Sequence, residues 1–352
     1  MKKIIVIAAA VLALASCTKV QSKVEVSREI SFQVANYLPT RAEAGAKYEN
    51  GNFGTYAWFN AADEFMVNEE VGPDGGQWAT VHHTFYWPKT GSVTFVSYSP
   101  FSGTNNTADS TPTVTKSGDT FRLAYGSAAA PVTVGDTDLM YADLVEANAN
   151  RDLLTDDLLD GQDSRYTGVP TLFRHALAKV RFEIGVTRTQ GGIAPDLTTW
   201  EVTVVNGNLS GIYGAGTLQM EWNGTEWVKP AGAVWSNASG SKNVALASNL
   251  KLTEQHQSLA DLGYVLPQAL DNQSISLNLH IRTVLPNGRS IEEDLTVERK
   301  LSEFSEEIVT WQMNKAILYR ILVDPTEKGE PILFDPAVAD WDSVTADSNW
   351  PI

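Results

Sequence analysis

Cys17 is the residue whose chemistry the sequence marks most clearly, because it is the only cysteine among 352 residues. It follows two lysines and an apolar run from Ile4 to Leu14, and it closes the tetrapeptide Leu14-Ala15-Ser16-Cys17. The run is shorter than the roughly 20 residues of a membrane-spanning helix, and small residues before the cysteine are typical of a cleavage site. The pattern therefore predicts a signal peptide over residues 1–16 that is removed.

The Cys17 thiol has a specific expected use. A chain with one cysteine forms no intramolecular disulfide, even in an oxidising compartment. Leu14, Ala15 and Ser16 before the sulfur form a lipobox, which predicts a diacylglyceryl group on the sulfur and a further acyl chain, such as palmitate, on the freed amine. At about 0.8 kcal/mol per buried methylene, two or three chains would hold the protein on a bacterial membrane. The alternative is a secretory signal that happens to carry a cysteine.

Other side chains are not spaced for catalysis or for metal binding. The sequence has no nucleophile elbow, Walker loop, HExxH or CxxC. His82 and His83 are adjacent, but neighbours in a strand point to opposite faces, so we predict a surface strand beside Tyr86 and Trp87 rather than a metal site. We therefore predict no enzymatic activity, no metal and no cofactor.

A run of acidic residues is the second candidate for metal binding. Its members are Asp152, Asp156, Asp157, Asp160 and Asp163. Their spacing does not match the calcium loop of an EF-hand, which favours a solvated acidic loop. Two of the 42 acidic residues could still meet as a glycosidase pair, although no pair stands out.

The charge of the chain excludes one class of partner. The formal net charge is −16, and loss of residues 1–16 removes two lysines and makes it more negative. No Lys/Arg cluster of the kind that follows a phosphate backbone is present, so we expect no nucleic acid partner. Solubility is the simplest explanation of the acidity.

The elements that would position these residues are strands, and we predict an all-β protein. Turn-forming residues are scattered evenly, aromatic residues are frequent, and no long helical apolar stripe appears. Alternating strand candidates occupy residues 30–38, 92–98, 180–186 and 200–204, and residues 274–297 read as a hairpin. Asn287-Gly288 predicts a type I′ turn in that hairpin. The segments Tyr141–Leu159 and Leu252–Leu262 look helical.

The length of the chain predicts two domains. About 335 mature residues exceed what one hydrophobic core usually covers. An acidic stretch between Asp136 and Asp163 separates two strand-rich halves, so we place the boundary near residue 170. The predicted domains are residues 17–170 and 171–352.

Three tryptophans leave a different function open. Trp222, Trp227 and Trp235 lie in a Gly/Asn-rich region, where exposed rings could stack on sugars. Aromatic rings in a sandwich belong to the core more often than to a binding platform. A surface glycan-binding lipoprotein stays open as an alternative function.

Several segments along most of the chain resemble the fimbrillin family, the pilus subunits and related surface lipoproteins of Bacteroides-type bacteria. They follow the lipobox in this order: ISFQVANYLPTRA at 30–42, FYWPKTGSVTFVSYSP at 85–100, DLMYAD at 138–143, LFRHALAKVRFEI at 172–184, YVLPQAL at 264–270, WQMNKAILYRILV at 311–323 and FDPAVADWDS at 334–343. Each piece is weakly specific, whereas their order and spacing together are more so.

The resemblance implies two tandem transthyretin-like β-sandwich domains and assembly by donor-strand exchange into a surface fimbria used for adhesion. The first strand, at about 24–38, would plug its own domain through Ile30, Phe32, Val34 and Leu38. An arginine-specific protease would cut between Arg41 and Ala42, in an exposed loop over residues 39–52, and another subunit would fill the vacated groove. The expected partners are other fimbrial subunits, that protease, and the outer membrane through Cys17. Arg41 could instead be an ordinary linker residue of a protein that stays anchored.

Overall fold

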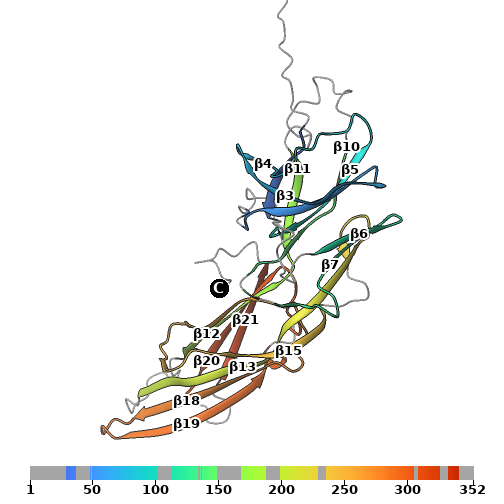
Figure 1. Cartoon of the computed structure of the whole chain (residues 1–352). Helices are drawn as coiled ribbons and strands as arrows, with labels where there is room; N and C mark the ends of the chain where they lie inside the picture. Colours follow the sequence, from blue (N-terminus) through green and yellow to red (C-terminus); the bar gives the residue numbers. More distant parts are fainter. Residues whose placement is uncertain are drawn as a thin grey trace, which may run out of the picture.

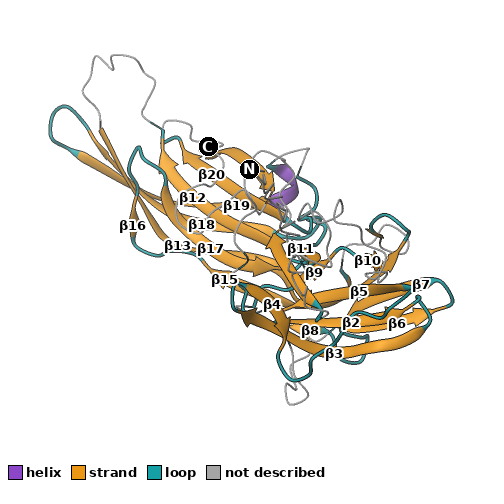
Figure 2. Cartoon of the chain, turned by 90° about the horizontal axis from the view of Figure 1, so that it is seen from above, coloured by secondary structure: helices purple, strands orange, loops and turns teal. Residues whose placement is uncertain are grey.

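A computed structural model describes residues 29–36, 48, 50–101, 112–133, 135, 137–148, 168–187, 199–228, 235–304, 308–325 and 332–340. These residues form strands almost throughout, and a single 3-10 turn, η4 (Leu301–Glu303), interrupts them (Figure 2). The predicted all-β class is confirmed. No helix of the described residues is long and apolar enough to cross a membrane.

The first half of the chain forms a closed sheet. Its eight strands follow the order β10-β5-β2-β3-β4-β1-β11-β9, and pairing of β9 with β5 closes seven of them into a barrel. The strands are β1 (Ser31–Asn36), β2 (Phe53–Phe59), β3 (Asp63–Asp74), β4 (Gln77–Thr80), β5 (Ser92–Ser99), β9 (Met140–Ala142), β10 (Val145–Asn148) and β11 (Val169–His175). This barrel occupies the upper half of the molecule in Figure 1.

Alternation fills the barrel with apolar side chains. In β11 every second residue is buried, as in a strand with one face in the core, whereas β5 is buried on both faces from Val93 to Ser99. The interior contains Ile30, Phe32, Tyr48, Phe53, Ala57, Met66, Val71, Trp87, Val93, Phe95, Met140, Ala142, Ala147, Val169 and Phe173. The first half is thus a closed sheet, and its classification as a transthyretin-like sandwich stays a prediction.

The second half contains two facing sheets. One has the order β17-β12-β20-β21 and consists of β12 (Ala178–Val186), β17 (Gln257–Val265), β20 (Lys315–Val323) and β21 (Ile332–Asp340). The other includes β13 (Thr199–Trp222), β15 (Ser236–Ala245), β16 (Leu250–Lys251), β18 (Ser274–Val284) and β19 (Ser290–Lys300). A core with Phe182, Leu209, Leu277, Trp311 and Tyr319 lies between them. The two sheets form the lower half of Figure 1.

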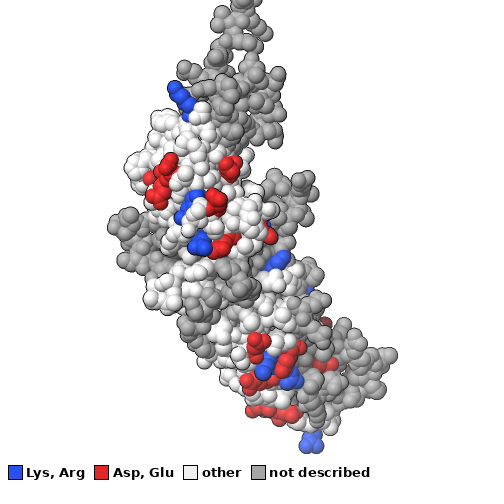
Figure 3. All heavy atoms as spheres, turned by 90° about the vertical axis from the view of Figure 1, so that its right-hand side faces the viewer, with Lys and Arg blue, Asp and Glu red and all other residues white. Residues whose placement is uncertain are grey.

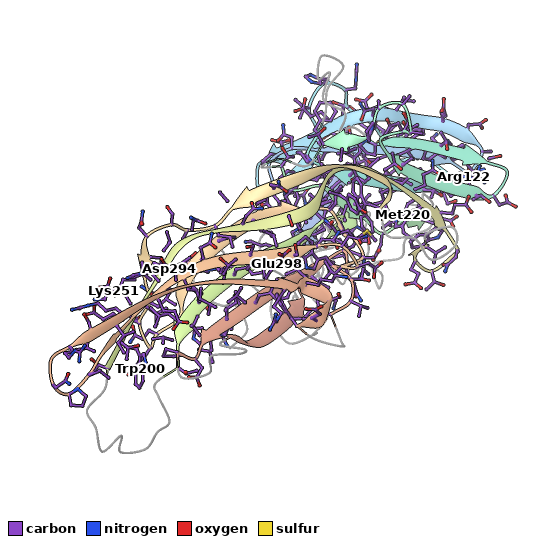
Figure 4. All side chains as sticks on the ribbon, turned by 90° about the horizontal axis from the view of Figure 1, so that it is seen from below. Arg122, Trp200, Met220, Lys251, Asp294 and Glu298 are labelled. Atoms are coloured by element: carbon purple, nitrogen blue, oxygen red, sulfur yellow. The ribbon has the colours of Figure 1, made fainter. Side chains whose placement is uncertain are left out.

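The long strand β13 joins the two halves. Residues 199–210 pair with β18, whereas residues 218–221 pair with β7 (Thr120–Tyr125), which in turn pairs with β6 (Thr113–Ser117). The short strands β8 (Val132–Thr133) and β14 (Trp227–Val228) add to the same part of β13. Figure 4 labels Trp200 and Met220, which lie near the two ends of β13 and in different halves of the molecule.

A further core lies where the β6-β7-β13 layer covers the outside of the barrel. Trp58, Val96 and Tyr141 face it from the barrel, and Leu123, Tyr125, Leu218 and Met220 face it from the layer. Because a closed sheet has apolar side chains on both faces here, its strands need cover on the outside as well. The two halves are therefore packed on a common core through β13.

A buried glutamine pair fixes the bend of β13 at this junction. Gly211 has φ = 78° at a register shift between Leu209 and Ile212, and an added Cβ would lie 2.6 Å from the Asn272 oxygen. Gln273 donates from Nε2 to the Gly211 carbonyl at 3.0 Å, and Gln268 Oε1 accepts from the Tyr213 backbone N–H at 3.1 Å. Buried amides satisfy the backbone groups that the bulge removes from the ladder.

Two local predictions are wrong. Tyr141 and Ala142 belong to β9, Val145–Asn148 form β10, and residues 257–262 belong to β17. The described parts of both predicted helices therefore consist of strands and short connections. Pairing with β5, β11 and β12 overrides a weak helical pattern there. Residues 149–159 lie outside the described residues.

The hairpin at 274–297 is confirmed as β18 and β19, but its turn differs from the predicted type I′. Gly288 has φ = 80°, and Asn287 is not among the described residues with positive φ. Gly288 donates its N–H to the Leu285 carbonyl at 2.9 Å, as in a type I turn. Pro286 fixes φ near −65°, which suits the second residue of a type I turn and excludes type I′.

Candidate functional site

The most unusual feature of the barrel is the position of its first strand. β1 lies between β4 and β11, running antiparallel to β4 and parallel to β11. A strand from the very start of the described chain thus sits inside a sheet whose other strands come from residues 53–175. Loss of β1 would leave two unpaired strand edges facing each other across an apolar gap.

Ile30 and Phe32 anchor this strand. Their side chains are 2% and 1% exposed, and the Phe32 ring meets the rings of Phe53 and Phe95 edge-on, with centroids 5.6 Å and 5.7 Å away. Edge-on aromatic pairs add about 0.5–1.5 kcal/mol each to simple burial. Val34 is only partly buried and packs against the same core. The pocket for Phe32 is therefore the deepest point of the gap that β1 fills.

Gly168 allows the backbone of β1 to come this close to β11. It has φ = 97°, and a Cβ on it would lie 2.7 Å from the carbonyl carbon of Phe32. Only glycine adopts such a φ easily while leaving room for a neighbouring backbone. No local sequence signal identified this residue, because its role depends on a strand more than 130 positions away.

Replacement of Gly168 by alanine should loosen β1. Strain at positive φ costs about 1–3 kcal/mol, and the contact with Phe32 adds a clash that cannot relax without moving β1. Hydrogen exchange of the β1 amides is the measurement, and these should exchange faster while the C-terminal sandwich stays protected. Gly224→Ala is the matched control, because Gly224 has φ = 101° but no atom within 4 Å of its added Cβ. Equal exchange in both variants would contradict the assigned role of Gly168.

The start of β1 is held by residues 81–87, here called the strap, which follow β4. Ile30 donates its backbone N–H to the Phe85 carbonyl at 2.8 Å, and Glu29 pairs with Tyr86 in an isolated bridge. The strap is fixed to β3 on its other side by His82 with Glu70, at 2.9 Å, and by His83 with Glu69, at 3.0 Å.

Below the apolar pocket, a buried polar cluster fixes neighbouring strands. The Tyr48 hydroxyl lies 2.5 Å from Ser99 Oγ, and Asn50 Nδ2 donates to the Asp138 carbonyl at 2.8 Å. His175 Nδ1 lies 2.8 Å from an Asp138 carboxylate oxygen, and both side chains are nearly inaccessible. Buried polar groups of this kind fix one arrangement because each needs its partner.

The buried tyrosines predict alkaline sensitivity. Burial raises the pKa of Tyr141 to about 12, and burial also raises the pKa values of Tyr48, Tyr125 and Tyr319. Folding favours the protonated phenols, so their contribution to stability is complete below the ordinary pKa near 10 and is lost as pH rises towards 12 and above. Absorbance at 295 nm should show these phenols ionising only together with unfolding. Smooth ionisation near pH 10 in the folded protein would contradict this.

The sequence matches a known protein family. A family model described as fimbrillin-like matches residues 40–341, which is most of the chain. The chain belongs to the fimbrillin-like family. The resemblance predicted from the sequence is thereby confirmed.

One solved structure agrees with the family at the level of fold, and a second is reported for comparison. A fimbrial protein from Bacteroides vulgatus is 14% identical, with a TM-score of 0.52, over 90% of this chain and 100% of that chain. The tip fimbrial protein Mfa3 from Porphyromonas gingivalis, in a C-terminally truncated form, is 10% identical, with a TM-score of 0.33, over 83% of this chain and 94% of that chain. Among proteins with curated functions, none matches this sequence.

Several predicted residues of this fimbrillin-like chain cannot be placed. Cys17, Leu38, Arg41 and Ala42 lie outside the described residues, as does the acidic run at 152–164. Of the four residues predicted to plug the first domain, Phe32 and Val34 lie on β1 and Ile30 lies directly before it. Ile30 and Phe32 are buried in the barrel core, and the partly buried Val34 packs against it. The residues that line the pocket of Phe32, chiefly Phe53, Phe95 and Gly168, were not predicted from the sequence.

The three tryptophans considered as a sugar-binding platform in this fimbrillin-like chain contact other parts of the protein. Trp227 and Trp235 are 8% and 4% exposed, and their indole N–H groups donate to the Ala142 and Ala176 carbonyls at 2.9 Å each. Trp222 packs edge-on against Trp227 at 5.5 Å. Trp227 and Trp235 are therefore core residues, and the partly buried Trp222 packs against that core. Within the described part of the chain, no three His, Cys, Asp or Glu side chains gather as ligands for a metal.

Proposed function

We propose that this chain is a structural subunit of a bacterial surface fimbria, which is exported as a lipoprotein precursor and assembled by protease-triggered donor-strand exchange. The observation that carries the proposal is the position of β1, a removable first strand placed between β4 and β11 in a closed sheet. Membership of the fimbrillin-like family supports the same role. The subunit would contribute to adhesion at the cell surface and would have no enzymatic activity.

In this proposal, the lipid on Cys17 delivers the precursor to the outer membrane. Cleavage between Arg41 and Ala42 by an arginine-specific protease then separates β1 and the lipid from the rest of the chain. The vacated groove offers unpaired backbone groups and the apolar pockets of Ile30 and Phe32, and both are satisfied at once by an incoming strand. Without cleavage, the same protein would stay anchored.

β21 is the segment of this chain best suited to fill such a groove. It lies at a sheet edge, where β20 is its one partner among the described strands. It begins Ile332-Leu333-Phe334, the same spacing of isoleucine and phenylalanine as Ile30-Ser31-Phe32. A β21 strand from a neighbouring copy would place Ile332 and Phe334 in the two pockets while keeping the direction of β1.

Pro336 is compatible with that register. It would take the position of Val34. The backbone N–H of Ile30 donates to Phe85 of the strap, which continues from β4, and since N–H groups alternate along a strand, the N–H of Val34 points to the same side. The β1–β4 register ends at Phe32, so a proline at the position of Val34 removes no hydrogen bond to β4.

The test begins with the lipid-free precursor and an arginine-specific protease. We expect a new N-terminus at Ala42, followed by a ladder of polymers on a gel. Arg41→Lys should abolish both, whereas Arg122→Lys, at an exposed arginine of β7, should change neither. Phe334→Asp should block a subunit as donor but leave it able to accept a strand from an unaltered copy. Cleavage at Arg41 that yields only monomers would refute strand exchange.

A further inference from the structure

Three exposed apolar side chains lie on the strap and on β3, the strand to which the strap is attached. Val67 is 56% exposed, Val81 is 50% exposed and Tyr86 is 55% exposed. Val67 belongs to β3, and the other two belong to the strap that is attached to β3. We call Val67, Val81 and Tyr86 the strap patch. Single exposed apolar residues are common. Several on the segment that holds the start of β1 are typical of a surface that binds another protein.

The strap patch is held in place by its surroundings. Val81 donates its N–H to the Glu70 carbonyl at 2.8 Å, and Thr80 Oγ1 donates to the His83 carbonyl. The Phe85 ring meets Phe65 edge-on at 5.6 Å, and both rings pack against the barrel core. A surface fixed in this way can bind without first becoming ordered.

A second exposed apolar residue marks the other end of the molecule. Ile291, which is 57% exposed, lies near the tip of the β18–β19 hairpin and pairs with Thr283. The hairpin lies at the lower end of the molecule in Figure 1, opposite the barrel. In Figure 3, acidic and basic side chains are interspersed at this lower end of the molecule.

β21 starts at the same end as Ile291. Ile332 pairs with Val323, whose carbonyl accepts the N–H of Thr187, and a chain of backbone contacts leads from there across the sandwich to the hairpin. Its links are Val186 N–H to Thr253 O, Leu252 N–H to Val202 O, and Val202 paired with Ile281. A β21 strand that leaves its own sheet but stays joined to β20 therefore departs from the end of the sandwich that carries the hairpin tip.

We infer that the strap patch is the seat for the β18–β19 hairpin end of a second copy of this chain. The inference rests on the proposed strand exchange. With Ile332 in the pocket of Ile30, the donor chain leaves the groove at the strap, where Ile30 bonds to Phe85. Residues 324–331 then separate the groove from the end of donor β20, a reach of at most about 26–29 Å.

This contact is heterologous, because each copy uses its barrel end against the hairpin end of the next copy. Contacts of that kind build open filaments when the rotation between copies does not close a ring. The seat would fix the angle between neighbouring subunits, which the exchange of a single strand alone would not set. The strap patch of one copy would thus bind the same neighbouring copy that donates its β21 strand to the groove.

The experiment separates binding in the groove from seating on the patch. After protease treatment of the full lipid-free chain, a synthetic peptide of residues 330–340 reports groove binding, and light scattering reports polymer growth by whole subunits. In the double variant V81D/Y86D we expect unchanged peptide affinity and growth slowed about tenfold or more. Ile291→Asp on the donor should slow growth to the same extent.

Val309→Asp is the control, because Val309 is 53% exposed but belongs to neither end surface, and it should leave growth unchanged. Thermal unfolding of each precursor shows whether the variants are folded. Normal growth of V81D/Y86D, or loss of its peptide binding, would overturn the seat and leave strand exchange intact. Failure of the peptide to bind the unaltered chain would instead refute the proposed function.

Discussion

Replacement of Phe32 by alanine should lower the free energy of unfolding of the precursor by about 3–5 kcal/mol. The Phe32 side chain is 1% exposed and fills a pocket between the rings of Phe53 and Phe95, so its removal leaves a cavity that the closed sheet cannot collapse. Urea denaturation measures the change, and the midpoint should fall with little change in the slope. Hydrogen exchange should show β1 as the first strand to open.

Leu172→Ala is the control for the Phe32 variant. Leu172 lies on β11, next to β1, but its side chain is 38% exposed on the outside of the barrel. A substitution there should change the stability by about 0.5 kcal/mol or less. Similar losses for both variants would mean that the Phe32 pocket does not carry the burial assigned to it.

Replacement of Gln268 by leucine should cost about 2–5 kcal/mol. The side chain is 2% exposed, accepts from the Tyr213 N–H, and donates to the Leu266 carbonyl at 3.0 Å. Leucine has a similar size but leaves both backbone groups buried without a partner, at about 1–3 kcal/mol each. Because the pair with Gln273 fixes the bend of β13, near-ultraviolet circular dichroism should change in addition to thermal stability.

Gln257→Leu provides the comparison for the Gln268 variant. Gln257 Oε1 accepts the Thr253 N–H at 3.1 Å in an exposed position, where water can replace the lost bond. We expect little effect there. If Gln268→Leu is equally mild, the junction is held by apolar packing and not by the glutamine pair.

Local pattern predicted much of this fold. The segments predicted from Ile30, at Ser92–Tyr98 and at Val180–Val186 correspond to β1, β5 and β12. A strand with one buried face imposes period two on its sequence, as in β12, whereas β5 is buried on both faces. The hairpin at 274–297 was equally readable, since its strands are adjacent in the chain. These elements need only nearby residues to define them.

What sequence reasoning missed depends on distant partners. Only Trp200–Val204 of the 24-residue β13 was predicted, because the remainder contains several glycines and changes partner from β18 to β7 along its length. Closure of the barrel by β9 and β5, and the place of Gly168 beside Phe32, are likewise set by contacts between remote segments. The residues of the first strand that enter the pocket were therefore predictable from the sequence, whereas the residues that line the pocket were not.

The continuity of β13 has a mechanical consequence. Its 24 residues span about 80 Å if extended, and they connect the β18 side of the sandwich to the layer that covers the barrel. A pull along the long axis would pass through one unbroken backbone rather than a linker. The antiparallel hydrogen bonds to β18 lie across that direction, so they would be loaded together in shear instead of opening one by one.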